Sequence, residues 1–338
     1  MEGTIVNDRA LAVLEKYDIE VLRSWKGRSA ILCETKTGIK ILKEYKGGGE
    51  RLLTQQKMLE EIKKKEFYNI EEIVSTKEGD ILVKDEDMNS YYLKEYSTGK
   101  ECNIRESRDI GHVVEQMAVL HKAMELPLLV TEKNMEPFSL PKEFAKHNRE
   151  LRKVKKYLKT KRQKNDFEYY LYRNFDFFLK KAEKILEEME KYSDVFAGEK
   201  VIERGCLCHG DFQHHNALMR EKEVYFINFE KYILDDPMRD LSLFFRKIME
   251  KNNWQQETGQ LMLESYEKQK LLTEEDRIQL FYRLSYPEKF WKIVNFYYGT
   301  SKAWIPAKNM EKLEKILKQE EEKVNFLQRN FPEQVLHK

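Results

Sequence analysis

The sequence predicts an α+β fold with two lobes: an antiparallel sheet carrying one helix, and then a larger, mainly helical lobe. Three observations lead to this prediction. Short runs rich in β-branched and aromatic residues alternate with turn signals over roughly the first hundred residues. Beyond them, apolar residues recur at helical spacing. The chain has 338 residues, of which 41% are hydrophobic, so it is long enough to bury the cores of two lobes.

The first lobe is predicted to follow the order β-β-β-α-β-β after a short N-terminal helix. The turn between the second and third strands contains Gly38, where a positive φ is tolerated. Leu52, Leu59 and Ile62 recur at helical spacing and predict the helix that follows the third strand. The expected helices are 8–17 and 50–65, and the expected strands are 19–25, 29–35, 38–45, 79–85 and 90–96.

The second lobe is predicted to be helical apart from a segment of strands and turns at 206–232. The strand pattern gives way to a helix pattern near residues 97–99, so we expect lobes at 1–97 and 98–338. The expected helices are 108–124, a strongly basic helix at 142–164, a long helix at 167–192, and nearly all of 239–331.

Composition limits the classes of partner and compartment. Lys and Arg total 61 and Asp and Glu total 59, so the net charge of +2 gives no reason to expect nucleic acid. The four cysteines are scattered apart from Cys206 and Cys208, which favours reduced thiols over a disulfide framework. No stretch approaches the roughly 18 apolar residues of a membrane span, and the first residues do not resemble a secretory signal. We therefore expect a protein without a membrane span in the reducing cytoplasm.

The clearest chemical signal is His209, Asp211 and Asn216 in the segment "CHGDFQHHN". Protein kinases use H-R-D-x-x-x-x-N, in which the aspartate faces the substrate hydroxyl and the asparagine binds Mg²⁺. Asp211 and Asn216 have the same separation of five positions. An apolar, strand-like run, "VYFINF", follows about a dozen residues later. The combination favours phosphoryl transfer over a chance match.

Lys43, near the end of the third predicted strand, is the second anchor. Nucleotide phosphotransferases place such a lysine against the α- and β-phosphates and hold it with a glutamate from the next helix. Glu60 lies at a suitable distance along that helix, and Gln56 is an alternative one turn earlier. The sequence has only a weak match to a glycine-rich phosphate loop. A backbone cradle for the phosphates would consist of residues 27–29 and end at Ser29. The other interpretation of Lys43 is a solvated lysine at the end of a strand.

The order of these elements resembles the aminoglycoside phosphotransferase and choline kinase superfamily, the small-molecule branch of the kinase fold. Several segments are similar to CotS-type spore coat proteins of endospore-forming bacteria. The resemblance spans roughly residues 10–331 and implies a protein-kinase-like, bilobal fold with a nucleotide cleft between the lobes. The segments are "GIKILKEY", "CHGDFQHHN", "DDPMRDLSLFFRKIMEKNNW", "SYEKQKLLTEED" and "LSYPEKFWKIVNFYYGTSKAW".

Carried over by motif, the resemblance implies a role for each residue. It makes Asp211 the candidate base and Asn216 a candidate metal ligand. His209 is expected to brace the catalytic loop rather than to react. Asp240 is expected to support that loop from the following helix by accepting backbone hydrogen bonds.

The sequence departs from the family pattern at Asn228, the remaining candidate metal ligand. The phosphotransferases carry an aspartate there, whose charge holds Mg²⁺ between the phosphates. An asparagine keeps one oxygen and loses the charge, and a unit charge pair at short range is worth about 4 kcal/mol at an effective dielectric near 20. Glu230 would point to the same face of a strand and is a candidate substitute. ATP and Mg²⁺ are therefore candidate cofactors that Asn228 puts in doubt.

Two functions stay open. One is a spore coat or coat-associated protein on a kinase-like scaffold, with nucleotide binding and little or no catalysis, whose partners are other coat proteins. The other is an active ATP-dependent phosphotransferase acting on a hydroxyl of a small molecule such as a sugar. The resemblance and Asn228 favour the first, and the retention of Lys43, Asp211 and Asn216 favours the second.

Two further patterns have ordinary interpretations. His214 and His215 lie near Cys206 and Cys208, but adjacent side chains in an extended segment point in opposite directions, which does not favour a metal site. The basic stretch 142–164 would suit an anionic partner. Its apolar residues at helical spacing would pack underneath, however, which favours a basic face that is merely solvated over a binding surface.

Overall fold

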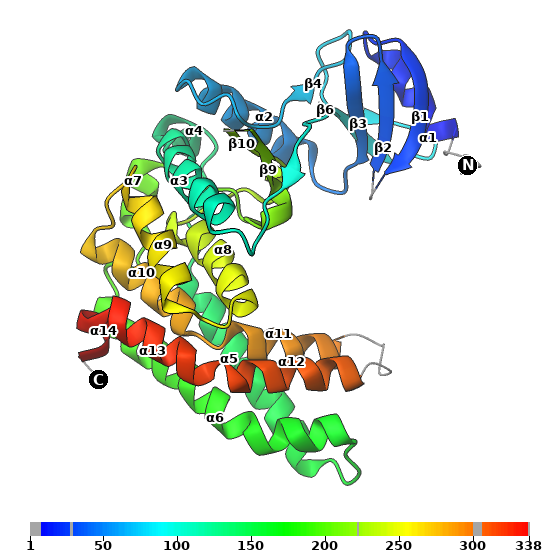
Figure 1. Cartoon of the computed structure of the whole chain (residues 1–338). Coiled ribbons are helices and arrows are strands. Elements are labelled where there is room, and N and C mark those ends of the chain that lie inside the picture. The colour runs from blue at the N-terminus through cyan, green and yellow to red at the C-terminus, as the bar shows by residue number, and fades with distance from the viewer. Residues whose placement is uncertain (1–7, 28–29, 222, 300–305, 337–338) are drawn as a thin grey trace.

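The computed structural model of the chain describes residues 8–27, 30–221, 223–299 and 306–336. The strands of its N-terminal part are β1 (Val21–Gly27), β2 (Ala30–Thr35), β3 (Gly38–Glu44), β4 (Ile73–Val74), β5 (Val83–Lys84) and β6 (Ser90–Glu95). They form one antiparallel sheet in the order β1-β2-β3-β6-β4, with β5 also paired to β6. The sheet lies at one end of the molecule and the long helices lie at the other (Figure 1).

The two faces of this sheet serve different purposes because side chains alternate along each strand. On one face, Leu42 and Leu93 pack under α1 (Asp8–Ala12) in a small core of their own. On the other face, Lys43 of β3 and Lys94 of β6 line a cleft toward the helical part. The alternation that builds the core of the sheet therefore also places two lysines at the cleft.

Three local details differ from the sequence prediction. The helix expected at 8–17 changes from α1 to a 3₁₀ helix at Val13–Lys16. The strand expected at 79–85 is reduced to β5, because Gly79 has φ +91° and the chain turns there before it can pair. The two residues of β4 were not predicted, since so short a strand shows no alternation. The helix expected at 50–65 is found as α2 (Gly49–Lys64).

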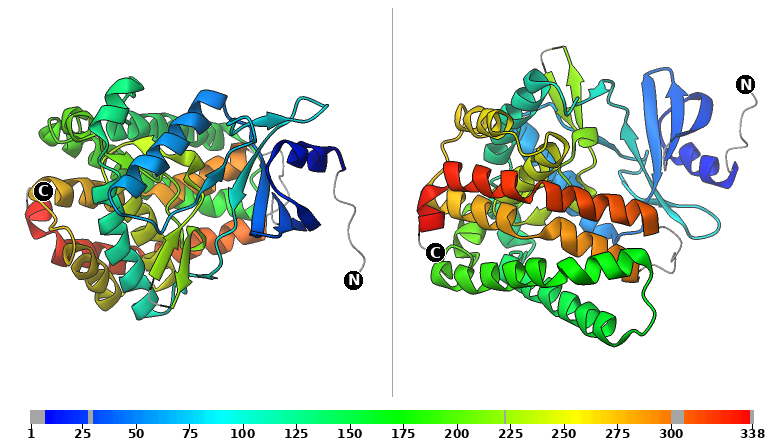
Figure 2. Two further views of the ribbon diagram at one scale, coloured as in Figure 1. Left: turned by 90° about the horizontal axis from the view of Figure 1, so that it is seen from above. Right: turned by 60° about the horizontal axis from the view of Figure 1, so that its bottom comes forward.

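The rest of the chain is mainly helical, as predicted. Long helices from distant parts of the sequence pack side by side, with α5 against α6 and α11 and α12 against them (Figure 2). The helices are α3 (Ser107–Ala123), α4 (Pro127–Glu132), α5 (Leu140–Thr160), α6 (Asp166–Met189), α7 (Glu199–Arg204), α8 (Met238–Lys251), α9 (Gln256–Glu267), α10 (Glu274–Ser285), α11 (Glu288–Gly299), α12 (Pro306–Lys318), α13 (Glu320–Asn330) and α14 (Pro332–Leu336).

The basic helix ends earlier than predicted. It stops at Thr160, and Lys161 is already extended, with ψ 117°. Asn165 then starts α6 with a capping box: its side chain accepts a hydrogen bond from the backbone N–H of Glu168, and the Glu168 carboxylate accepts one from the backbone N–H of Asn165. The cap signal of Asn165 therefore prevails over the continuing run of basic residues.

Two small sheets hold the loop that carries the H-G-D motif. They consist of β8 (Leu207–Cys208) with β11 (Ile233–Leu234), and of β10 (Glu223–Phe226), β9 (Ala217–Arg220) and β7 (Lys100–Glu101). The division of the chain into 1–97 and 98–338 stays a prediction, and β7 pairs within the second part. In the described residues, no helix is both long enough and apolar enough to cross a bilayer.

Candidate functional site

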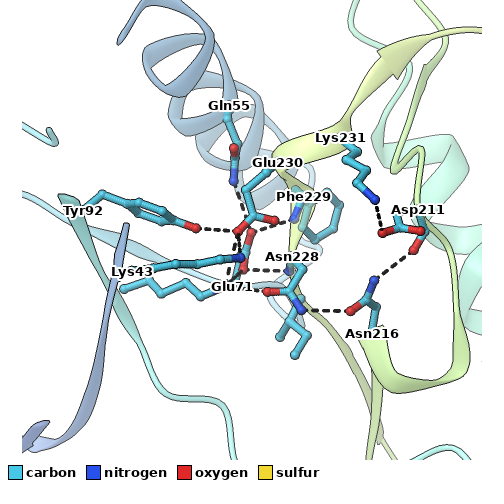
Figure 3. Close-up of polar contacts among 12 residues, drawn as sticks. Lys43, Gln55, Glu71, Tyr92, Asp211, Asn216, Asn228, Phe229, Glu230 and Lys231 are labelled. Atoms are coloured by element: carbon cyan, nitrogen blue, oxygen red, sulfur yellow. Dashed lines mark hydrogen bonds and ion pairs between the residues drawn. The ribbon is translucent and has the colours of Figure 1, made fainter. Parts of the chain in front are cut away.

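Residues from both parts of the chain line one cleft of about 1580 Å³. Lys43 and Lys94 come from the paired strands β3 and β6. Asp211, Asn216 and Asn228 come from the loops around β9 and β10. The structure therefore brings Lys43 to the same cleft as the H-G-D motif, and Figure 3 shows the polar contacts that connect them.

His209 shapes the catalytic loop from inside the protein. Its side chain is fully buried. Nδ1 accepts a hydrogen bond from the backbone N–H of Asp211 at 3.2 Å, and Nε2 lies 2.9 Å from the carbonyl oxygen of Ile227. In a neutral imidazole the proton then sits on Nε2, which donates to Ile227. His209 holds Asp211 in place and has no access to a substrate.

Asp240, in the first turn of α8, anchors the same loop. Its two carboxylate oxygens accept hydrogen bonds from the backbone N–H groups of His209 at 2.6 Å and Gly210 at 2.9 Å, which confirms the contact expected from the sequence. Gly210 has φ +79°, and a Cβ there would lie 2.0 Å from the carbonyl oxygen of Lys231. Only glycine fits this close approach of two backbone segments.

Each oxygen of Asp211 accepts a hydrogen bond from a neighbouring side chain. Oδ1 accepts a hydrogen bond from Nε2 of Gln213 at 2.6 Å, and Oδ2 accepts one from Nζ of Lys231 at 2.8 Å. Burial alone would raise the pKa of Asp211, but the hydrogen bonds from Lys231 and Gln213 hold it below its ordinary value. A substrate hydroxyl would share Asp211 with these two donors, since each carboxylate oxygen can accept a second hydrogen bond.

Asn228 and Asn216, the two candidate metal ligands, bind each other. Nδ2 of Asn228 donates to Oδ1 of Asn216 at 2.8 Å, and Nδ2 of Asn216 donates to the carbonyl oxygen of Asp211 at 2.9 Å. Oδ1 of Asn228 accepts a hydrogen bond from Nζ of Lys94 at 2.8 Å. Both amide oxygens that could bind a metal therefore already hold protein donors, one of which is an ammonium group.

Lys94 is the buried cation of this network, with 3% of its surface exposed. Its second partner is Oε2 of Glu71 at 2.7 Å. The Glu71 carboxylate also accepts hydrogen bonds from the backbone N–H groups of Asn228 and Phe229, each at 2.8 Å. Asn228 has φ +69°, a left-handed conformation that asparagine tolerates better than most residues. Lys94 and Glu71 together fix the turn that carries Asn228.

Lys43 pairs with Glu230 and not with Glu60. Its Nζ contacts Oε1 of Glu230, which also accepts a hydrogen bond from the hydroxyl of Tyr92 and lies 3.9 Å from Nζ of Lys94. Burial opposes ionisation of Glu230, but Lys94 and Lys43 hold its pKa well below the ordinary value. Glu60 is exposed on the far side of α2, so the expected Lys43–Glu60 pair is wrong.

Two other residues of α2 reach the site. Nε2 of Gln55 donates to Glu71 at 3.2 Å, and the guanidinium group of Arg51 donates to the carbonyl oxygen of Tyr232 at 2.6 Å. Helical spacing could have identified them. The same spacing that buries the apolar side chains of α2 also buries Gln55 and turns Glu60 outward.

Sequence patterns could have identified some of the remaining site residues but not others. Lys94 follows Tyr92 by two positions in the strand run "SYYLKEY", so alternation places both on the cleft side, but no motif singles Lys94 out. Glu71 lies outside every predicted element. Ser29, the predicted end of a phosphate cradle, lies outside the described residues, and Gly27 pairs with Ala30 at the end of the β1–β2 hairpin.

The donor set at Asn216 and Asn228 does not suit Mg²⁺. This ion prefers oxygen ligands that include one or two carboxylates, whereas both candidate ligands are neutral and hydrogen-bonded. The ammonium group of Lys94 would also repel a divalent ion, and Glu230 is turned to Lys43. Within the described residues, no three or more His, Cys, Asp or Glu side chains form a metal-binding group. All four cysteines are free and buried.

Known proteins share the sequence pattern and the fold of this chain. The family described as "Spore coat putative kinase YutH" matches residues 11–330. An aminoglycoside phosphotransferase from Alicyclobacillus acidocaldarius has a similar structure over 100% of this chain and 98% of its own, with a TM-score of 0.85 and 20% identity. An AMP-bound spectinomycin phosphotransferase matches over 92% and 95%, with a TM-score of 0.68 and 13% identity. A choline kinase from Cryptosporidium parvum matches over 94% and 96%, with a TM-score of 0.53 and 13% identity. At these identities the three structures show a common fold, which confirms the predicted protein-kinase-like architecture.

Proposed function

This chain belongs to the family described as "Spore coat putative kinase YutH", and from that premise we propose that it is a coat-associated protein with a nucleotide-binding cleft and little or no phosphoryl transfer. One observation carries the proposal: Nζ of Lys94 donates to Oδ1 of Asn228, the position at which the phosphotransferase pattern has an acidic metal ligand. A fixed ammonium group supplies positive charge there without a metal ion. Nucleotide binding at this cleft would then be independent of Mg²⁺.

The cleft supports the nucleotide part of the proposal. It lies between the sheet and the helical part, and Lys43 and Lys94 face into it. The spectinomycin phosphotransferase with the same fold was solved with AMP bound, and an amicoumacin kinase with a similar fold was solved with AMP-PNP. Of the two lysines, Lys43 is the more accessible, with 28% of its side chain exposed against 4% for Lys94.

The state of Asp211 supports weak catalysis. A general base must be within hydrogen-bonding reach of the hydroxyl that it deprotonates. Gln213 and Lys231 each donate a hydrogen bond to Asp211, and its lowered pKa makes the carboxylate a poorer proton acceptor. Asn216 and Asn228 do not suit Mg²⁺ either, so the cleft lacks an acidic metal ligand at these two positions.

The second candidate function is an active ATP-dependent phosphotransferase for a hydroxyl of a small molecule such as a sugar. The presence of Lys43, Asp211 and Asn216 in one cleft favours it. This function requires that a nucleotide and Mg²⁺ rearrange the contacts of Asn228 and Asp211. It therefore predicts metal-dependent nucleotide binding, whereas the first function does not.

Thermal unfolding of the full chain with ATP separates the two functions. A ligand at about 100 times its Kd stabilises a protein by about 2.7 kcal/mol, which is readily measured as a rise in Tm. We expect ATP to raise the Tm equally in EDTA and in Mg²⁺, without release of phosphate from ATP. No shift in either buffer would remove nucleotide binding. A shift only with Mg²⁺, together with phosphate transfer, would establish the second function.

Coat association is the other half of the proposal. It rests on the family, and the partners would be other coat proteins. Four buried, free cysteines are compatible with synthesis in a reducing cytoplasm. A fluorescent fusion expressed during sporulation should move from the mother-cell cytoplasm to the forming spore. A uniform cytoplasmic signal in mature sporangia would contradict coat association and leave the nucleotide result untouched.

A further inference from the structure

A second cavity lies within the helical part and meets the catalytic loop at Asp211. Its volume of about 490 Å³ is in the range of small-molecule sites. Helices α5, α8, α10 and α11 form its walls, and the loop at Gly210, Asp211 and Gln213 forms one end. Four carboxylates line it, whereas the basic side chains number six: Arg239, Arg246, Lys247, Arg283, Lys289 and Lys292.

Helix α8 supplies half of these cations from one face. Arg246 and Lys247 follow Arg239 by seven and eight positions, which is about two helical turns. The three side chains therefore project from the same side of the helix. The opposite side, which includes Phe244 and Ile248, is completely buried. The amphipathic pattern of α8 therefore turns a basic face toward the cavity.

Carboxylates in and around the cavity pair with all of its basic side chains except one lysine. Asp235, which does not line the cavity, lies 3.0 Å from Arg239 and 2.8 Å from Arg283. Glu250 lies 3.8 Å from Arg246 and 3.5 Å from Lys289, and Glu288 lies 3.8 Å from Arg246 and 3.1 Å from Lys292. Lys247 has no carboxylate within ion-pair distance in the part of the chain that the structure describes.

Burial shifts the pKa of two side chains that line the cavity. Burial lowers the pKa of Lys247, and the positive charge of the nearby Lys289 lowers it further. Glu250 raises the pKa and partly offsets these two effects. Burial raises the pKa of Glu143, so this carboxylate contributes less negative charge than an exposed one. The potential within such a cavity concentrates anions.

Aromatic side chains give the cavity a rigid apolar wall. The Trp291 ring stacks on His147 with centroids 3.5 Å apart, and its Nε1 donates to Glu150 at 2.8 Å. Phe144 stacks on Tyr286 with centroids 3.8 Å apart. These contacts fix the orientation of Trp291 and Phe144, which both line the cavity.

We propose that this cavity binds a small organic anion of monosaccharide size, whose carboxylate or phosphate group bonds to Lys247 and whose body packs against Trp291 and Phe144. Its remaining polar groups would face Asp211 at the end of the cavity. The inference does not rest on nucleotide binding, because the cavity and the cleft share only the loop at Asp211. It assigns the ligand a charge opposite to that of an amino sugar.

Isothermal titration of the full chain with four probes on one hexose ring tests the proposal. The probes are glucuronate, glucose 6-phosphate, neutral glucose and cationic glucosamine, each used up to about 10 mM so that millimolar affinities are measurable. We expect one or both anions to bind, with an affinity that falls as salt rises. The stronger of the two anions identifies the oxyanion. Inorganic phosphate alone should bind more weakly, because it lacks the body that packs against the aromatic wall.

Matched variants locate the site. Lys247→Gln should weaken anion binding by at least about tenfold, the usual effect of losing a hydrogen bond to a charged group. Lys251→Gln removes the same charge from an exposed position on the same helix and should change binding by less than about twofold. Since Lys247 has no ion pair to lose, its substitution should leave the Tm unchanged.

Three outcomes would overturn the proposal. One is binding of neither anion over the whole concentration range. Another is binding of glucose or glucosamine as strong as that of the anions. The third is an equal effect of Lys247→Gln and Lys251→Gln. Neither anionic probe carries a purine, so these results stand apart from those obtained with ATP.

Discussion

The cleft and the helical cavity meet at Asp211 but balance their charges differently. Six basic and six acidic side chains line the cleft, and its two central lysines are paired, Lys94 with Glu71 and Lys43 with Glu230. Six basic side chains and four carboxylates line the cavity, and Lys247 there has no ion pair among the described residues. The two central lysines of the cleft are thus held in ion pairs within the protein, whereas Lys247 of the cavity is the lysine left for a ligand.

The paired lysines have a structural consequence. Lys94 and Glu71 tie the turn at Asn228 to the sheet, and Arg51 and Gln55 tie α2 to the same region. An incoming phosphate must compete with carboxylates that are already in place. We therefore expect modest nucleotide affinity in the cleft.

The largest expected effect is the loss of stability on replacing Lys94. Lys94→Met leaves the buried Glu71 without its cation, and breaking a buried pair in this way costs about 3–5 kcal/mol. Urea unfolding should show this decrease. Lys84→Met, at an exposed position of β5, should change the free energy of unfolding by less than about 0.5 kcal/mol. A loss below about 1 kcal/mol for Lys94→Met would mean that the cleft pair is not structural.

The next effect tests why the cleft does not suit Mg²⁺. Asn228→Asp replaces the amide that donates to Asn216, so that two oxygens face each other with no proton between them. A divalent ion relieves that contact, and we expect Mg²⁺ to strengthen ATP binding by about tenfold in this variant only. Asn295→Asp, at an exposed position of α11, is the control for the added charge. If Mg²⁺ has no effect on Asn228→Asp, the ammonium group of Lys94 excludes the metal by itself.

Removing the carboxylate that pairs with Lys43 should leave the cleft with an unpaired lysine, as the cavity has in Lys247 within the described part of the chain. Glu230→Gln keeps the shape of the side chain and leaves Lys43 free to bind a phosphate. We expect ATP in EDTA to bind about fivefold to tenfold more tightly, a gain near 1 kcal/mol. Glu101→Gln, at an exposed position that lines the same cleft, should leave the affinity unchanged. Weaker ATP binding to Glu230→Gln would place Glu230 among the groups that support the nucleotide.

The last expected effect is on the pH dependence of stability. The pKa of Glu230 lies well below its ordinary value near 4.5 in the folded protein. Below that value the unfolded chain takes up a proton that the folded protein does not, so acidification destabilises the folded state, by at most about 1.4 kcal/mol per pH unit for one group. A glutamate in the unfolded chain titrates between about pH 5 and pH 3. Urea unfolding over this range should show a smaller loss of the free energy of unfolding for Glu230→Gln than for the unchanged protein. Parallel losses would show that Lys94 and Lys43 do not hold Glu230 ionised.

The sequence predicts a site residue best when the partners of that residue lie close to it along the chain. His209, Asp211 and Asn216 belong to one short segment, so their spacing was sufficient to find them. Lys43 was found because its strand ends in a recognisable pattern. The prediction of Glu60 is wrong because helical spacing turns this residue outward, although a glutamate is a suitable partner for a lysine. Lys94 lies 23 positions from Glu71 and 134 positions from Asn228 along the chain. Only the folded structure brings these three residues into contact.

The sequence by itself determined the two-part architecture, the strands and helices that alternation and helical spacing specify, and the loop that carries Asp211. These features depend on residues close together in the chain, where backbone geometry relates position to direction. Only the tertiary structure decided which charges are paired. Lys43 could have met Glu60 or Glu230, and Asn228 could have faced a metal or Lys94, because the energy of an ion pair depends on distance and burial in space and not on separation along the chain.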